Sequence, residues 1–237
     1  MAIQTSPRTV ARAIALLFLL TIIGGVFAQG LVADRLINFR DATATADNIL
    51  AHRGLFQIGF TVYLIEMAGN VATAALWYVL LRPVSRPVAL TAAFLDLTAC
   101  IVKTFARVLF IAPLWVLGAA SSNLANQALH GFTSEQVQSL ALVLLRVNDT
   151  GAATAMAFFG FSGVLNGYLI FRSTFLPRWL GVLGMICGCC WLLFLYPPLG
   201  RGAFGITAIF GLLTSVVMIG WLLVKGVDVA KWNEQAK

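Results

Sequence analysis

Six ionisable side chains lie inside the long apolar blocks of this sequence, and they are the residues whose chemistry needs explanation. Three are acidic and three are basic: Glu66, Asp96, Asp149, Lys103, Arg107 and Arg146. One charge near the middle of a bilayer costs about 3 kcal/mol on insertion scales, so six unpaired charges would cost on the order of 15–20 kcal/mol. That exceeds the net stability of a typical domain. We therefore expect these side chains to be paired, hydrated, or close to an interface.

Helical spacing places several of these side chains on shared faces. Asp96, Lys103 and Arg107 are separated by seven and four residues, so they lie on one face of a helix. Glu66 and Asn70 share a face of another helix, and so do the two charges of the fourth apolar block. This pattern predicts a polar cavity that opens towards the outer side of the membrane. Its candidate ligand-binding residues are Glu66, Asn70, Asp96, Lys103, Arg107, Arg146 and Asp149.

Three functional interpretations of this set stay open. In the first, which we favour, the protein binds or moves a small polar or amphipathic molecule: Lys103 and Arg107 hold an anionic group and Asp96 accepts a proton. In the second, the ion pairs only fix helix packing in a structural or accessory protein, because the set is neutral overall. In the third, Asp96, Lys103 and Glu66 serve an intramembrane enzyme. We expect no catalytic residue, and the interpretation leans away from an enzyme.

The apolar blocks that carry these charges are long enough to be membrane-spanning helices. Of 237 residues, 60% are hydrophobic and 11% are charged, and the mean hydropathy is +0.90. About 20 apolar residues in a helix cross the hydrocarbon layer. The sequence predicts an all-α polytopic helical bundle that forms a single transmembrane domain over residues 1–237. The expected spans are about 11–32, 54–81, 88–118, 137–171, 179–196 and 204–224.

The first span carries an alternative interpretation. Arg8 and Arg12, followed by an apolar run that reaches Val26-Phe27-Ala28, resemble a cleaved signal peptide. The apolar run continues to Val32, which favours a retained helix.

The distribution of basic residues predicts the orientation of the spans. With six spans, one side of the membrane receives nine basic residues and the other side receives four: Arg8, Arg12, Arg82, Arg86, Arg172, Arg178, Lys225, Lys231 and Lys237 against Arg35, Arg40, Arg53 and Arg201. Basic residues are enriched in cytoplasmic loops. We therefore expect both termini in the cytoplasm and the protein in the bacterial inner membrane, with membrane lipids as its surroundings.

The ends of several helices are also expected to be marked by local signals. Thr133 and Gln136 form a capping box, and Thr45 is expected to cap a helix that continues towards Leu81. The long second and fourth helices are expected to tilt, to project outward, or to kink near Gly54 or Gly151. Pro113 is expected to interrupt the third span near its outer end.

Two rows of glycine predict a close contact between consecutive helices. Glycines recur at spacings of three and four in the fourth span and again in the fifth: Gly160, Gly163 and Gly167, then Gly181, Gly184 and Gly188. Such rows let two helix backbones approach closely. A short loop joins the two spans, so we expect them to pack as antiparallel neighbours.

Metal, cofactor and nucleic-acid sites are not predicted. Cys187, Cys189 and Cys190 lie close enough to bind a soft metal, but cysteine in a membrane helix more often fills space. His52 and His130 fall in outer segments and are expected to be loop residues rather than a metal pair. The sequence lacks a phosphate-binding glycine loop or a nucleophile elbow. Since no basic cluster interleaved with aromatic residues remains outside the membrane, we expect no nucleic-acid partner.

Several segments resemble one bacterial membrane-protein family. They are RDATATADNILA at 40–51, the Gly59-Phe60 entry to the second span, Leu81-Arg82-Pro83-Val84, and GYLIFRSTFLPRWLGVL at 167–183. Together they are similar to the family described as domain of unknown function 4386, over most of the chain. The resemblance implies a bacterial helical membrane protein and brings no substrate or cofactor. This sequence has Gln57 where the family's entry to the second span is expected to carry arginine.

Overall fold

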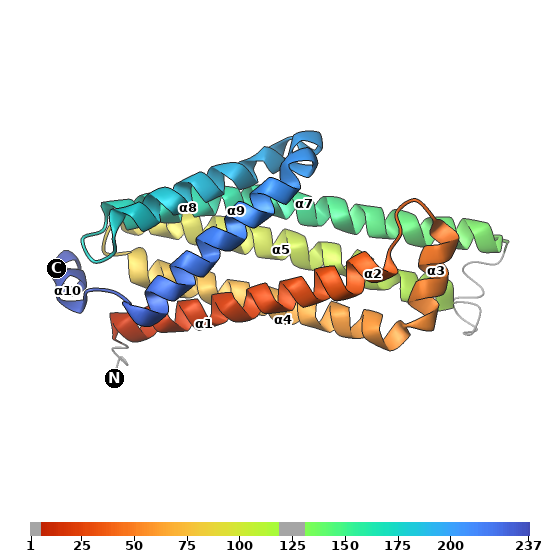
Figure 1. Ribbon diagram of the computed structural model, residues 1–237, viewed down its shortest axis with the longest axis horizontal. Helices are drawn as coiled ribbons and strands as arrows, with labels where there is room; N and C mark the ends of the chain where they lie inside the picture. Colours follow the sequence, from red (N-terminus) through yellow and green to blue (C-terminus); the bar gives the residue numbers. More distant parts are fainter. Residues whose placement is uncertain (1–5, 119–130) are drawn as a thin grey trace. The chain divides into compact units, whose positions relative to one another are not determined.

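The computed structural model describes residues 6–118 and 131–237, and every regular element in these ranges is helical. Within them, six helical stretches are long and apolar enough to cross a membrane (Figure 1). They are Pro7–Leu36, Arg53–Leu81, Arg86–Leu117, Ser134–Arg172, Arg178–Leu195 and Pro197–Val224. These ranges match the six expected spans to within a few residues at most ends, so the predicted all-α, polytopic fold is confirmed.

The chain separates into two compact units. Unit 1 comprises Met1–Thr21, Ala68–Ile101 and Ala153–Lys237, and unit 2 comprises Ile22–Met67 and Val102–Ala152. Four long helices each contribute residues to both units: α1 (Pro7–Val26), α4 (Arg53–Leu81), α5 (Arg86–Leu117) and α7 (Ser134–Arg172). A single domain over 1–237 stays a prediction.

In unit 1, the last part of α7 packs against α8 (Arg178–Trp191) through their glycines (Figure 1). A Cβ atom added to Gly167 would lie 2.6 Å from the Met185 nitrogen, and one added to Gly188 would lie 2.8 Å from the Gly160 carbonyl oxygen. The two backbones thus touch where the sequence predicts. The chain turns back through a 3-10 helix (Leu192–Leu195) into α9 (Pro197–Val224).

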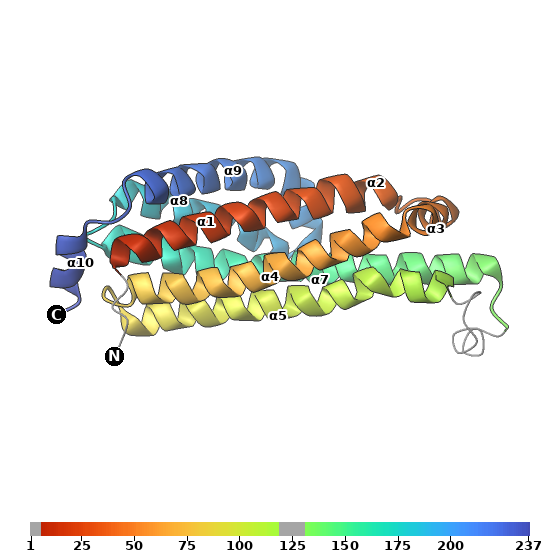
Figure 2. The ribbon, with the colours of Figure 1, turned by 90° about the horizontal axis from the view of Figure 1, so that it is seen from below.

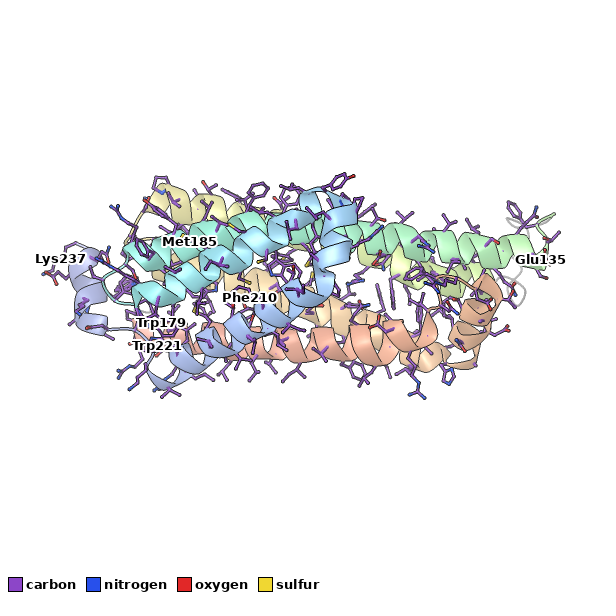
Figure 3. All side chains as sticks on the ribbon, turned by 45° about the horizontal axis from the view of Figure 1, so that its top comes forward. Glu135, Trp179, Met185, Phe210, Trp221 and Lys237 are labelled. Carbon is purple, nitrogen blue, oxygen red and sulfur yellow. The ribbon has the colours of Figure 1, made fainter. Side chains whose placement is uncertain are left out.

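The end of the chain docks onto the helix ends of unit 1. Asp228 caps α10 (Val229–Gln235) by accepting a hydrogen bond from the Lys231 nitrogen. Trp232 Nε1 donates to the Leu80 carbonyl oxygen at 2.9 Å. Nearby, Figure 3 shows Trp179 of α8 beside Trp221 of α9, and their rings meet edge to face at 5.5 Å. Short polar contacts and ring packing therefore hold the C-terminal helix and this end of the bundle.

Unit 2 contains the irregular part of the first span. After α1 the helix widens into a π-helical segment, η1 (Phe27–Ala33), and ends in α2 (Asp34–Leu36). A short helix, α3 (Ala42–Ala51), follows and lies across the direction of α4 (Figures 1 and 2). Phe56 of α4 stacks on Phe110 of α5 with 4.3 Å between ring centroids, and both rings are fully buried. This apolar core adjoins Tyr63, whose ring meets Phe110 edge to face at 5.4 Å.

The predicted helix ends are partly wrong. Asp41, not Thr45, caps α3, because the Asp41 side chain accepts a hydrogen bond from the Ala44 nitrogen. Thr45 lies one turn inside the helix, where its hydroxyl is buried against Asn38 and Asp41 carbonyls. The chain breaks at His52, close to the expected kink near Gly54.

One expected break does not occur, and one expected cap is present. Pro113 lies inside α5, which continues to Leu117. Proline lacks the backbone N–H that would bond to the carbonyl four residues earlier, and α5 continues despite the loss of this one bond. The helix α7 is continuous through Gly151, where a kink is one of the expected alternatives for this long helix. The Thr133–Gln136 capping box is present, since each backbone nitrogen donates to the other residue's side-chain oxygen, at 2.9 and 3.3 Å.

The glycine contact generates a first prediction. In Gly188→Ala, the new methyl group would lie 2.6 Å from the Val164 nitrogen. Separating two packed backbones should lower the free energy of unfolding by about 1–3 kcal/mol. Thermal unfolding of the purified protein in detergent measures this loss. Gly220→Ala is the matched control, because a Cβ there meets nothing within 4 Å. Equal stability of both variants would contradict the packing account.

Candidate functional site

A buried ion pair joins α4 to α5 in unit 2. Lys103 Nζ lies 2.8 Å from Glu66 Oε1, and the two side chains are 11% and 9% exposed. The Glu66 carboxylate also faces Gly25 of α1, where an added Cβ would stand 3.7 Å from Oε1. Glu66 Oε2 is buried and accepts no hydrogen bond from the described residues. One carboxylate oxygen is therefore paired, and the other retains an unused acceptor.

Arg107, one turn beyond Lys103 on α5, is the most deeply buried charge of unit 2, at 4% exposure. Its Nη1 donates to Asn148 Oδ1 of α7 at 3.0 Å. Its guanidinium carbon lies 3.5 Å from the centroid of the Tyr63 ring, a close cation–π contact. Nε has no acceptor within the described chain. Glu66 and Asp149 both interact electrostatically with this guanidinium.

Tyr63 extends the polar contacts to the first span. Its hydroxyl donates to Gln29 Oε1 at 2.8 Å, and Gln29 Nε2 donates to Asp34 Oδ1 at 2.7 Å. Gln29 belongs to the π-helical segment η1. Segments of this kind are frequent at functional sites. We refer to Glu66, Lys103, Arg107, Tyr63, Asn148 and Gln29 as the charged cluster.

Sequence reasoning missed three members of this cluster: Tyr63, Asn148 and Gln29. Tyr63 precedes Glu66 by three residues, so helical spacing could have placed both on one face. Asn148 lies between two residues that were identified as candidates. No spacing in the sequence indicated Gln29 as a site residue, because its position depends on the widened helix of η1.

The two candidate charges of α7 lie outside the buried part of unit 2. Arg146 is exposed, and its Nη2 donates to the Phe39 carbonyl oxygen at 2.7 Å while the guanidinium lies 4.9 Å from the Phe39 ring. Asp149 is also exposed and acts electrostatically on Arg107. Arg146 thus ties α7 to the loop before α3.

The remaining two candidates belong to unit 1. Asp96 of α5 is hydrogen-bonded to the Ser162 hydroxyl of α7, and Asn70 is half-buried on α4. The hydrogen bond between Ser162 and Asp96 therefore joins α7 to α5. Five of the seven predicted residues belong to unit 2, and three of these form its buried charges.

Among the described residues of both units, no group of three or more histidine, cysteine, aspartate or glutamate side chains could hold a metal ion. Cys187, Cys189 and Cys190 are free thiols. His130 lies outside the described residues, so a metal pair with His52 is not addressed.

In the described part of the chain, six helices that are long and apolar enough to cross a membrane, two of them joined by a buried ion pair, define an integral membrane protein of the polytopic α-helical class. The particular family follows from comparison with known families. The model of the family described as "Domain of unknown function (DUF4386)" matches residues 13–226, and the chain belongs to this family. No curated protein and no solved structure is matched by this chain.

The ion pair generates a second prediction. Lys103→Met leaves the Glu66 carboxylate buried without its cation, which should lower the free energy of unfolding by about 3–5 kcal/mol. The double variant Glu66→Gln/Lys103→Met should lose clearly less than the sum of the two single variants, because contacting residues couple. Unfolding of the wild type, the two single variants and the double variant in detergent measures this double-mutant cycle.

The exposed pair Asp228–Lys231 is the matched control, with 3.7 Å between Lys231 Nζ and Asp228 Oδ2. Exposed pairs contribute little to stability, so Lys231→Met should leave unfolding unchanged. Additive losses at Glu66 and Lys103 would show that the two side chains do not pair.

Proposed function

We propose that this protein binds, and moves, a small polar or amphipathic molecule at the charged cluster, which faces the outer side of the membrane. The observation that carries the proposal is that two buried polar atoms of the cluster, Glu66 Oε2 and Arg107 Nε, have no hydrogen-bond partner among the described residues. Buried polar groups in proteins nearly always have partners. The unpaired acceptor on Glu66 and the unpaired donor on Arg107 therefore favour a ligand that forms hydrogen bonds with both side chains.

The chemistry of these atoms defines the ligand class. Glu66 Oε2 requires a donor such as a hydroxyl or ammonium group, and Arg107 Nε requires an acceptor oxygen. The Tyr63 ring of the cluster meets Phe110 edge to face at 5.4 Å, so apolar side chains adjoin the polar atoms. A small molecule with both a polar and an apolar part, including a lipid headgroup with its chain, satisfies these requirements.

A second function is supported by the closeness of the contacts. Lys103 pairs with Glu66 at 2.8 Å, and Arg107 is stacked on Tyr63 and bonded to Asn148. Such a network can fix the positions of α4, α5 and α7 without any ligand. The protein would then be a structural or accessory component of the membrane.

The orientation of the chain is part of the proposal. The excess of basic residues at one set of helix ends supports cytoplasmic termini and location in the bacterial inner membrane. A fluorescent protein that matures only in the cytoplasm, fused after Lys237, should fluoresce, whereas alkaline phosphatase fused at the same position should be inactive. An active phosphatase fusion would reverse the proposed orientation.

Ligand binding is tested by native mass spectrometry of the protein released gently from its membrane. The wild type should carry a discrete adduct whose mass identifies a headgroup or a free small molecule. The variant Glu66→Gln/Lys103→Gln should lose it, because both changes remove charge with little change in shape. Arg86→Gln, which removes an exposed charge at the start of α5, should retain it.

A bare wild type, or identical lipid adducts on all three proteins, would contradict ligand binding at the charged cluster. Either result would favour the structural role.

A further inference from the structure

Asp96 in unit 1 forms a second polar site, separate from the charged cluster of unit 2. It lies on α5 and is hydrogen-bonded to Ser162 of α7, whose side chain is 2% exposed. The side-chain amide of Asn166, one turn further along α7, is also within hydrogen-bonding reach of Asp96. A hydroxyl and an amide therefore surround this carboxyl group.

The single proton of the Ser162 hydroxyl favours a protonated Asp96. The Ser162 hydroxyl contacts two oxygen atoms, Asp96 Oδ1 and the Phe159 carbonyl oxygen, the latter at 3.1 Å. A hydroxyl has one proton to donate and lone pairs that accept. If Asp96 were ionised, both neighbours would be acceptors that compete for this one proton, although the Phe159 carbonyl oxygen also has its backbone partner within α7. A protonated Asp96 donates to Ser162 Oγ, and Ser162 then donates to the Phe159 carbonyl oxygen.

The charges around Asp96 lead to the same state. Across the residues that the structure describes, its recorded partners are the neutral Ser162 and Asn166. Lys103, seven residues further along α5, is already paired with Glu66. An ionised carboxylate without a cation is costly inside a membrane, and a neutral carboxylic acid avoids that cost.

The packing of α7 holds Ser162 in place. The adjacent Gly163 faces Gly188 of α8, where an added Cβ would stand 3.3 Å from the Gly188 Cα. This backbone contact limits movement of α7 relative to α8 within unit 1. The hydroxyl that accepts the hydrogen bond of the protonated Asp96 is therefore held in position by this backbone contact.

We propose that Asp96, with Ser162 and Asn166, is a proton-binding site within the membrane-spanning part of unit 1. Release moves the proton from the Asp96 carboxyl group to water or another base, and the Ser162 hydroxyl turns from the Phe159 carbonyl oxygen to the new carboxylate. Uptake reverses both movements, and no covalent bond between heavy atoms changes. The inference uses unit 1 alone and does not depend on the proposed ligand site.

The test uses dicyclohexylcarbodiimide, an apolar reagent that enters membranes. A protonated carboxyl group gives its proton to a nitrogen of the reagent while its oxygen adds to the central carbon, and the product rearranges to a stable N-acylurea. Peptide mapping of the treated wild type by mass spectrometry should find the adduct on Asp96. Asp96→Asn should lose it entirely, and Glu66→Gln should retain it. Glu66 of the wild type is the internal control, since it pairs with Lys103.

Infrared spectroscopy supplies a measurement that does not depend on reagent access. The difference spectrum between wild type and Asp96→Asn should contain the C=O band of a carboxylic acid. Ser162→Ala should shift that band, because the acid loses its acceptor. Bands of a carboxylate in place of the acid band, or an adduct on Glu66 with Asp96 unmodified, would overturn the proton site.

Discussion

Water is scarce in the hydrocarbon layer of a membrane, so a polar side chain on a membrane-spanning helix has to find its partner on another part of the same protein. This constraint explains why the charged side chains inside these spans bond between helices, whereas the buried hydroxyls of Thr21 and Thr73 bond to carbonyl oxygens of their own helices. Lys103 of α5 reaches Glu66 of α4, Arg107 of α5 reaches Asn148 of α7, and Ser162 of α7 reaches Asp96 of α5. Each contact joins two helices within one unit and fixes their register.

The same constraint explains why apolar contacts hold the helices together while polar contacts fix their register. Apolar burial does not drive association between helices that are already in lipid, so close van der Waals contact has to supply the attraction. In unit 1 that contact is made by glycines of α7 and α8, whose backbones touch near Gly167 and Gly188. In unit 2 aromatic stacking of Phe56 on Phe110 serves this purpose, and the charges lie beside it.

The parts of this fold that depend on local sequence could be predicted, and the parts that depend on tertiary contacts could not. Runs of apolar residues identify the spans, and glycine spacing identifies the α7–α8 contact, because both signals lie within one or two helices. The capping box at Thr133 is equally local. Between Asp41 and Thr45, both of which can cap α3, the choice depends on how the loop before α3 folds onto Asn38.

The candidate site shows the same limit. Spacing placed Lys103 and Arg107 on one face of α5, but it could not identify their partners, because Glu66 and Asn148 are 37 and 41 residues away in the chain. Arg146 and Asp149 shared a face as expected, yet that face is exposed. Helical periodicity predicts which residues of one helix lie together, whereas the neighbour of each face is determined by the tertiary fold.

The central claim, that the charged cluster holds a ligand between its two unused polar atoms, is tested most directly by solid-state nuclear magnetic resonance of the protein in its own lipids. With ¹⁵N-labelled arginine, the Nε–H proton of Arg107 should show a contact to a non-protein molecule, which the Arg107→Lys variant lacks. Contacts of this proton to protein and water alone would contradict the claim. The charged cluster would then serve only to hold the helices together.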